Sequence, residues 1–385
     1  MDPSSLTEKM TVPALCVPVK DISLISSSRK EVLLAVKGQK PVVEVPADMD
    51  PLNASDHRLI LFSPGCEVPE DLISKYGPPT TYTLTRGYDS MSYEEVLRKL
   101  LAPLDPPLAF ATVGHIAHFN LRDEYIPHRE LIGRVLLDKN KHLRTVVRKV
   151  NSLSNQFRTP ELEVIAARPG SETDLVAVVR EGGMAFTVDF ASVYWNSRLS
   201  TERERLLALF REGEVLVDMF AGVGALSCMA ARKGLEVHAN DLNPKGAECI
   251  EMNAQANGVD VNVYCLDARA FVRKLMNQGV FDKACRVHFV MNLPAMALEF
   301  LDVFRGLMPG DGEQMFRVHC HCFAKAQPPD EEISARVVEA LGSKITFELH
   351  EVRNVSPNKR MYCAEFDVPA DVLKDSAKRR KCSVE

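Results

Sequence analysis

The spacing of hydrophobic runs changes near residue 214. From there on, short apolar runs recur at intervals of roughly 20 to 30 residues with amphipathic helical segments between them: EVLVDMF, LEVHAND, VNVYCLD, VHFVMNL and FRVHCHCF. This alternation is typical of βαβ units and a parallel sheet. Two more β runs follow a predicted helix at 330–342, and their spacing predicts an antiparallel hairpin that closes the sheet. We therefore predict an α/β, Rossmann-like domain over residues 194–370, with a mostly parallel sheet of seven strands.

The pattern before residue 194 is less regular. Residues 1–105 combine short β-like runs with Pro and Gly breaks, and a proline-rich joint ends this segment. Residues 106–193 alternate strand and helix signals, which favours a smaller α+β domain. The last segment, 371–385, is basic and is expected to be a disordered tail.

Composition narrows the class of protein. The chain has 385 residues, of which 46% are hydrophobic and 26% charged, as in soluble globular proteins. We find neither an apolar run of about 18 residues, as a membrane helix needs, nor a signal peptide or clear transit peptide. The ten cysteines lack zinc-ribbon spacing, and several lie inside apolar strand-like runs, which indicates a reducing compartment. We expect a cytoplasmic protein without a membrane partner. The sequence KRRK at 378–381 leaves a nuclear location open, and the mitochondrial matrix stays open too.

Charge is unevenly distributed. The net charge of −5 argues weakly against a nucleic-acid partner, but residues 128–150 hold seven Lys and Arg residues against two acidic ones. Such a local basic patch is typical of a surface that contacts phosphates. A solvent-exposed helix face without a partner explains the same charges equally well.

Glycine and carboxylate positions predict a ligand site at the carboxyl ends of the strands. In VDMFAGVGALS, Gly222 and Gly224 lie between a strand and a helix, where glycine lets the backbone approach a ligand. Asp241 ends the next strand and can bind ribose hydroxyls, and Asp267 ends the third strand. Open α/β sheets bind their ligands at this edge.

The turn FAGVGA favours S-adenosylmethionine over a dinucleotide. It lacks the third glycine of the dinucleotide fingerprint, and Asp218 precedes it, so a pyrophosphate is disfavoured. A carboxylate at the turn suits a cationic amino-acid ligand. The alternative is an ordinary βαβ turn without a ligand.

Several motifs together resemble those of the archaeal and eukaryotic tRNA (guanine-37-N1)-methyltransferases. They are VYWNSRLSTERERL, DMFAGVG, ANDLNP, MNLPAMALEFL and RNVSPNK, with GHIAHFNLRDEYIPHRELIGRVLLDKN before them. The resemblance covers residues 108–368 well and the first hundred residues loosely. It implies a class I methyltransferase domain, S-adenosylmethionine as the methyl donor and tRNA as the substrate. It also implies methylation of N1 of the guanine 3′ of the anticodon, and an N-terminal domain that helps check tRNA shape. We expect a monomer.

The resemblance also assigns site residues. It implies Glu202, Asn292 and Arg158 as catalytic residues and no metal. For the cofactor it implies Arg203, Asp218, Phe220, Gly222, Asp241, Leu242, Asp267, Ala268 and Asn292. For the tRNA it implies Tyr194, Arg158 and Pro294. The chain departs from the family at Ser197 and Ala225, where the family usually has Pro; both changes loosen the backbone and remove no reactive group.

Glu202 is the predicted general base. N1 of guanine carries a proton that must leave before the nitrogen attacks a methyl group, and a carboxylate within hydrogen-bond reach can accept that proton. However, Thr201 and Glu204 fit a capping box, which would make Glu202 the first helical residue. There the helix dipole lowers basicity, whereas burial raises it. A surface glutamate at a helix start is the alternative.

Asn292 is expected beside the transferred methyl group, with a backbone-orienting loop Asn as the alternative. Methyltransferases that act on amino groups place Asn-Pro-Pro-aromatic there, whereas this chain continues with Leu293, Pro294 and Ala295. The absence of an aromatic clamp argues against an exocyclic amine as the target.

Two histidine groups are predicted not to bind metal. On a strand, His319 and His321 of HCHC face one side and the two cysteines the other, so we expect core positions. His115, His118 and His128 have no acid or cysteine set to complete a zinc site. Trp195 fits a domain-interface anchor as well as a stacking platform.

Two alternative functions stay open from the sequence. One is a methyltransferase for another RNA or for a protein, and the other is a non-catalytic RNA-binding protein with a decayed methyltransferase domain.

Overall fold

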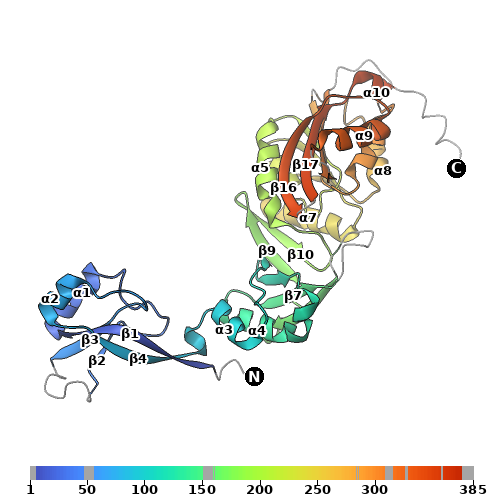
Figure 1. Cartoon of the computed structure of the whole chain (residues 1–385). Helices are drawn as coiled ribbons and strands as arrows, with labels where there is room; N and C mark the ends of the chain where they lie inside the picture. Colours follow the sequence, from blue (N-terminus) through green and yellow to red (C-terminus); the bar gives the residue numbers. More distant parts are fainter. Residues whose placement is uncertain are drawn as a thin grey trace. The chain divides into compact units, whose positions relative to one another are not determined.

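The computed structural model describes residues 6–46, 56–150, 159, 161–282, 284, 286–307, 315–325, 328–356 and 359–374. Contacts divide the chain into two units (Figure 1). The first comprises Met1–Phe110, Leu121–His142 and Ile165–Arg168, and the second comprises Ala111–Asn120, Leu143–Val164 and Pro169–Glu385. The segment predicted as a middle domain, 106–193, is therefore shared between the two units. Arg158 and residues 375–385 lie outside the described residues.

The first unit is built on a four-stranded antiparallel sheet in the order β2-β3-β1-β4. Alternate residues of β1 face opposite sides of this sheet. Leu15 packs in a cluster with Ile25 of α1 and Leu72 of α2, whereas Val12 and Ala14 belong to a second cluster. The elements are β1 (Thr7–Pro18), η2 (Val19–Asp21), α1 (Ile22–Ser28), β2 (Val42–Glu44), β3 (His57–Leu61), α2 (Glu70–Tyr76), β4 (Thr80–Gly87) and η3 (Tyr88–Ser90).

Two helices complete the first unit. The helix α3 (Tyr93–Leu101) begins at a capping box in which Ser92 and Glu95 exchange side-chain and backbone hydrogen bonds. It packs against α4 (Arg129–Lys139), which follows η4 (Asp123–His128). Gly133 lets α4 lie close to its neighbour, because a Cβ there would be 2.8 Å from the Cβ of Ala166.

The second unit contains the predicted seven-stranded sheet, in the order β13-β12-β11-β14-β15-β17-β16. The first five strands of this order run parallel, and β17 runs antiparallel to both β15 and β16. The predicted α/β fold and the closing hairpin are thus confirmed. The strands are β11 (Val215–Asp218), β12 (Glu236–Asn240), β13 (Asn262–Tyr264), β14 (Arg286–Met291), β15 (Met315–Ala324), β16 (Glu348–Ser356) and β17 (Lys359–Asp367).

Helices connect the strands of this sheet. They are α5 (Ser200–Leu209), α6 (Ala225–Arg232), α7 (Pro244–Asn257), α8 (Ala268–Asn277), η6 (Ala297–Phe304), α9 (Asp330–Leu341) and α10 (Ala370–Lys374). The connection after β14, expected to be an α-helix, is the 3-10 helix η6. The first residues of the predicted tail are helical, because Val372 and Leu373 of α10 are buried. None of the described helices is long and apolar enough to cross a membrane.

A smaller sheet and a hairpin precede the large sheet. The smaller sheet has the order β5-β6-β7-β8, and β9 pairs with β10. Asn253 and Asn257 of α7 hydrogen-bond the backbone of Thr187 and Ala185 in β10, which fastens the hairpin to the large sheet's helical layer. The strands are β5 (Ala111–Val113), β6 (Ile116–Phe119), β7 (Thr145–Lys149), β8 (Leu162–Ala167), β9 (Val176–Glu181) and β10 (Met184–Asp189).

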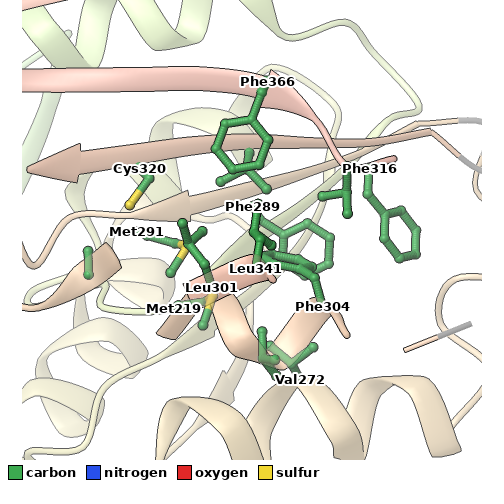
Figure 2. Packing of buried hydrophobic residues seen from close by; sticks show 14 of the residues in the cluster. Met219, Val272, Phe289, Met291, Leu301, Phe304, Phe316, Cys320, Leu341 and Phe366 are labelled. Atoms are coloured by element: carbon green, nitrogen blue, oxygen red, sulfur yellow. The ribbon is translucent and has the colours of Figure 1, made fainter. Parts of the chain in front are cut away.

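The main core lies between the large sheet and the helices α8, η6 and α9. Phe289 of β14, Phe304 of η6 and Phe316 of β15 interlock with edge-to-face ring contacts (Figure 2). Cys320 of β15 lies in the same cluster, as the alternation of HCHC predicts. This packed layer supports the strands β11 and β14, at whose carboxyl ends the candidate site lies.

Candidate active site

A cleft opens at the carboxyl ends of β11 and β14, which are neighbours in the sheet. Its walls come from the segment before α5, the first turns of α5 and the loop after β11. Seven of the residues predicted for the site line it: Tyr194, Glu202, Arg203, Asp218, Phe220, Gly222 and Asn292.

The helix α5 carries Glu202 on its buried side, not at its first position. The helix starts at Ser200, directly after the 3-10 turn η5 (Ser197–Leu199), and its N-cap position makes no side-chain hydrogen bond. The predicted capping box of Thr201 and Glu204 is therefore wrong. The carbonyls of the 3-10 turn precede the first N–H groups of α5 and take the place of a side-chain cap. Asn196 caps the 3-10 turn itself, where its side chain accepts from the Arg198 N–H at 3.1 Å.

Glu202 is 4% exposed and fully engaged, so a surface glutamate at a helix start is excluded. Arg205 donates to it twice, from Nε to Oε2 at 2.8 Å and from Nη2 to Oε1 at 2.9 Å. His321 Nε2 lies 2.8 Å from Oε1. Burial raises the pKa of Glu202, but the hydrogen bonds from Arg205 and His321 outweigh it and lower this pKa to about 2. Glu202 is thus a buried, ionised carboxylate.

His321 is the residue of this site that the sequence reading missed. It was expected to be a core position, yet it lines the cleft, contacts Glu202 and is fully buried. Its Nδ1 has no hydrogen-bond partner in the part of the chain that the structure describes. The alternation in HCHC correctly predicted that His321 lies on the opposite face of the strand from the cysteines. It could not predict that this face packs against α5.

The side chains of Glu202, His321 and Cys363 bring potential metal-ligating atoms within 4.8 Å of one another. This set does not fit a metal ion. Both Glu202 oxygens already accept from the Arg205 guanidinium, and burial raises the pKa of the Cys363 thiol well above its ordinary value. A cation would therefore have to displace a fixed positive charge and a tightly held proton.

Arg203 and Trp195 form a second buried group in the cleft. Arg203 makes a two-bond ion pair with Glu181, at 2.6 and 2.7 Å, and its guanidinium lies 5.1 Å from the Trp195 ring centre. Trp195 packs in a cluster with residues of β10, consistent with an anchor between the hairpin and the large sheet. Its Nε1 is buried and has no partner among the described residues, which leaves one N–H donor in the cleft wall.

Asp218 ends β11 in a buried position. Its carboxylate accepts from the Ser227 hydroxyl at 2.8 Å. Burial is the main cause that raises the pKa of Asp218 to about 7, and the bond from Ser227 only partly opposes it. A buried acid without a cationic hydrogen-bond partner is suited to a ligand that carries a positive charge.

Asp241 shapes the glycine turn from behind. Its carboxylate accepts from the Gly222 N–H at 2.8 Å and from the Asn243 N–H at 2.9 Å, and burial raises its pKa. Gly222 has a φ of +61°, in the left-handed region that favours glycine. Asp241 does not line the cleft itself, but it fixes the backbone that does.

The other predicted residues are placed as follows. Asp267 is exposed and caps α8 by accepting from the Arg269 and Ala270 N–H groups, Ala268 is buried and Leu242 is 41% exposed; none of the three lines the cleft. Pro294 lies in the loop after β14, where its carbonyl accepts from the Phe323 N–H at 3.0 Å. Asn292 is half-buried in the cleft wall, and Tyr194 is 45% exposed at the cleft. Phe220 packs edge-to-face on Phe300.

Part of the basic stretch at 128–150 is neutralised internally. Arg144 pairs with Asp174 at 2.9 Å, and Arg148 pairs with Glu163. His115 also contacts Asp174, whereas burial lowers the pKa of His118 to about 4. The number of Lys and Arg residues in this stretch is therefore larger than the number of positive charges available to bind phosphates.

The cleft fits a small cationic nucleoside ligand. The glycine turn offers a close backbone approach, Asp218 offers an unbalanced buried carboxylate, and Trp195 Nε1 offers a buried donor without a partner. Together with the seven-stranded sheet, this arrangement defines a class I, S-adenosylmethionine-dependent methyltransferase. Residues 177–344 match the TRM5/TYW2 methyltransferase domain, and residues 93–173 match the TYW2 N-terminal domain.

Similar proteins define the family more closely. The chain is 37% identical to a tRNA (guanine(37)-N(1))-methyltransferase of Danio rerio, over 97% of this chain and 82% of that one. It is 35% identical to the protein of the same name from Homo sapiens, over 97% and 76%. The chain belongs to the tRNA (guanine(37)-N(1))-methyltransferase family. The solved structure of Trm5b from Pyrococcus abyssi is 25% identical, with a TM-score of 0.62 over 92% of this chain and 99% of that one.

Proposed function

We propose that this chain transfers the methyl group of S-adenosylmethionine to N1 of guanosine 37 in tRNA, with Glu202 as the acceptor of the N1 proton. The observation that supports this most directly is the position of Glu202. It is a buried, ionised carboxylate in the same cleft as Asn292 and the glycine turn. The relatives named above carry this activity in their names.

Asp218, Gly222 and Trp195 are the residues that would hold the donor. Bound there, S-adenosylmethionine supplies a methyl group on a sulfonium sulfur, which N1 of guanine attacks once its proton has gone. Asp218 would balance the positive charge of the ligand, and the Gly222 turn would give it a close backbone surface. Asp241 would hold this turn in shape and meet the ribose from the edge of the site.

Glu202 needs help to accept the proton. Its pKa is lowered to about 2, far below that of guanine N1, so direct proton transfer is strongly uphill. Arg205 and His321 cause this low pKa, so the carboxylate becomes more basic when the incoming base weakens either contact. Excluding water from the cleft would act in the same direction.

Asn292 and Tyr194 are proposed to hold the target guanine. The half-buried amide of Asn292 can donate and accept along the guanine edge, and the Tyr194 ring at the cleft can stack on a base taken out of its stack. Arg158, carried over from the family, lies outside the described residues and keeps its assigned role only as a proposal.

The intact cleft disfavours the non-catalytic alternative. Glu202, the expected proton acceptor, lines the same cleft as five of the nine residues expected to bind the donor, which a decayed site would have no reason to keep. A methyltransferase for a different RNA or a protein is separated from the proposal by experiment. Purified protein, donor and tRNA transcripts with G or A at position 37 are incubated, and the nucleosides are analysed by mass spectrometry.

The expected result is 1-methylguanosine in the G37 transcript alone. Methylation of both transcripts, or of neither, would contradict the proposal. Binding of the donor measured by calorimetry then tells an inactive preparation from a protein without a donor site.

Three further proposals rest on the sequence and the family alone. They are a monomeric state, a role of the N-terminal domain in checking tRNA shape, and a cytoplasmic location. Additional nuclear and mitochondrial locations are open alternatives. Sedimentation, tRNA footprinting and microscopy of a tagged full chain test them in turn.

A further inference from the structure

Arg205 is shared by two buried carboxylates. Its Nη2 donates to Glu202 at 2.9 Å and to Glu365 of β17 at 3.1 Å. Its Nε and Nη1 add bonds to the same two partners, at 2.8 and 3.2 Å. The side chains of Glu202 and Glu365 are 4% and 7% exposed. One guanidinium thus balances two buried negative charges, and a change of charge on one carboxylate is felt by the other.

From Glu365, a chain of contacts crosses the sheet toward the surface. Glu365 Oε1 lies 2.6 Å from His319 Nδ1, and His319 Nε2 lies 3.0 Å from His288 Nδ1. His288 Nε2 lies 2.9 Å from Glu214 Oε2. Both imidazoles are almost fully buried, whereas the Glu214 side chain is 15% exposed. The chain therefore runs from behind the cleft to a group that reaches solvent.

The three contacts require an extra proton in this chain, although burial lowers the pKa of His288 to about 4 and outweighs the hydrogen bond with Glu214, which raises it. Each of its three contacts needs one proton between the two heavy atoms, because a carboxylate oxygen and a bare imidazole nitrogen can only accept. Two neutral imidazoles supply two of these protons. Without a third, two lone pairs would face each other at 3.0 Å or less in the core, which is strongly unfavourable.

The extra proton lies at the surface end of the chain. Burial raises the pKa of Glu365, but the bonds from His319 and Arg205 outweigh it and lower this pKa to about 2, so Glu365 is ionised. His319 Nδ1–H then donates to Glu365, and His288 Nδ1–H donates to His319. The third proton is left between His288 Nε2 and Glu214 Oε2, beside solvent.

We propose that the chain of Glu214, His288, His319 and Glu365 releases one proton to solvent when Glu202 takes one from guanine N1. This inference rests on the proposed function of Glu202. In the step, the N1–H bond breaks and an O–H bond forms on Glu202. Arg205 then has one carboxylate left to balance, which makes the potential at the chain more positive and expels the proton through Glu214.

The net charge of the buried groups is unchanged by this exchange, because one proton enters at Glu202 and one leaves at Glu214. The protein therefore does not have to reorganise to stabilise an added buried positive charge. His288 and His319 act as positioning residues, because neither lines the cleft.

Other charged or titratable groups face the chain and Glu202 from the elements packed around them. They are Arg286 of β14, Arg317 and His321 of β15, His350 of β16 and Cys363 of β17. The positive charges of Arg286 and Arg317 lie near the imidazoles and favour release of the extra proton.

The pH dependence of methyl transfer tests the inference. Single-turnover rates are measured with full-length protein, saturating donor and a G37 transcript. The proton exchange precedes methyl transfer and equilibrates with solvent, so the wild-type rate should rise about tenfold per pH unit between roughly pH 6 and pH 8. In His319→Gln the proton stays on Glu202, so the rate should change less than about threefold over that range.

Matched measurements exclude a general structural effect. His238→Gln is the control, since His238 is a buried histidine that contacts Tyr264 and Glu236, outside this chain. It should keep the wild-type slope, and dissociation constants for donor and tRNA should stay unchanged in both variants. A wild-type slope in His319→Gln, or an equal loss of slope in the control, would overturn the inference.

A second readout needs no variant and no activity. With ¹⁵N-histidine labelling, the full chain should show that His288 Nε2 carries or shares a proton near neutral pH; an Nε2 that does neither would overturn the inference. If the proposed function is wrong, Glu202→Gln stays fully active while this proton is still seen. If only the chain is wrong, Glu202→Gln is inactive and His288 Nε2 shares no proton.

Discussion

The two ends of the cleft hold acidic side chains in opposite electrostatic states. At α5, Glu202 is paired with Arg205 and His321, and its pKa is lowered to about 2. At the end of β11, Asp218 is bonded to the hydroxyl of Ser227, and burial raises its pKa to about 7. One acid is balanced within the fold, whereas the other is left unbalanced.

This difference matches the charges of the two ligands. S-adenosylmethionine is cationic, and a buried carboxylate that lacks a strong cationic partner gains most from binding it. Guanine is neutral, so an acid that meets it has to be balanced by the protein. Each end of the cleft can thus be tested by removing one acid and following one ligand.

The largest effect is expected at the balanced end. Glu202→Gln should slow single-turnover transfer by ~10²-fold or more, because the proton acceptor is lost. Arg205 keeps Glu365 as a partner, so the fold should survive. Donor affinity should stay unchanged, which calorimetry measures. Glu204→Gln is the matched control, since Glu204 lies on the same helix and is exposed; an undiminished rate in Glu202→Gln at neutral pH would refute the assignment.

Much of the fold could be predicted from sequence because its cause is local. The strands β11, β12 and β14 are short apolar runs, and the glycine turn after Asp218 needs a φ that favours glycine. Such signals lie within a few residues of the structure they specify. The connection after β14 was predicted as an α-helix, but it is a 3-10 helix, because apolar spacing alone separates the two poorly.

The electrostatics of the site could not be predicted in the same way. The sequence places Glu202 at a helix start, but its partner His321 is 119 residues away, and Arg205 reaches Glu365 across 160 residues. These contacts depend on how α5 packs on β15 and β17. The ionisation state of Glu202 therefore depends on tertiary packing. Its position in a ligand-binding cleft, in contrast, could be predicted from the motif.

At the unbalanced end, Asp218→Asn should weaken donor binding by roughly 10- to 100-fold, as expected when a charge-assisted contact is lost. Wild-type affinity should also fall as the pH drops below about 7, because the protonated acid no longer balances the ligand. The variant should show no such dependence. Calorimetry at several pH values checks both statements; a pH-dependent affinity in Asp218→Asn would assign the titration to another group.

A smaller effect is expected from the acid behind the glycine turn. Asp241→Ala removes the acceptor for the Gly222 and Asn243 N–H groups and should weaken the donor by about tenfold. Asp241→Asn keeps one carbonyl oxygen and should lose less. Equal donor affinity in Asp241→Ala and wild type would show that the turn needs no support from this carboxylate.

The smallest effect concerns Trp195, whose Nε1 is a buried donor without a partner among the described residues. If the donor ligand accepts this hydrogen bond, Trp195→Phe should weaken its binding about fivefold, the size of a neutral hydrogen bond. In the ligand-free protein the same change removes an unsatisfied polar atom, so thermal stability should hold or rise slightly. Donor affinity that is unchanged, together with higher stability, would mean that Nε1 belongs to neither end of the cleft and that Trp195 serves packing alone.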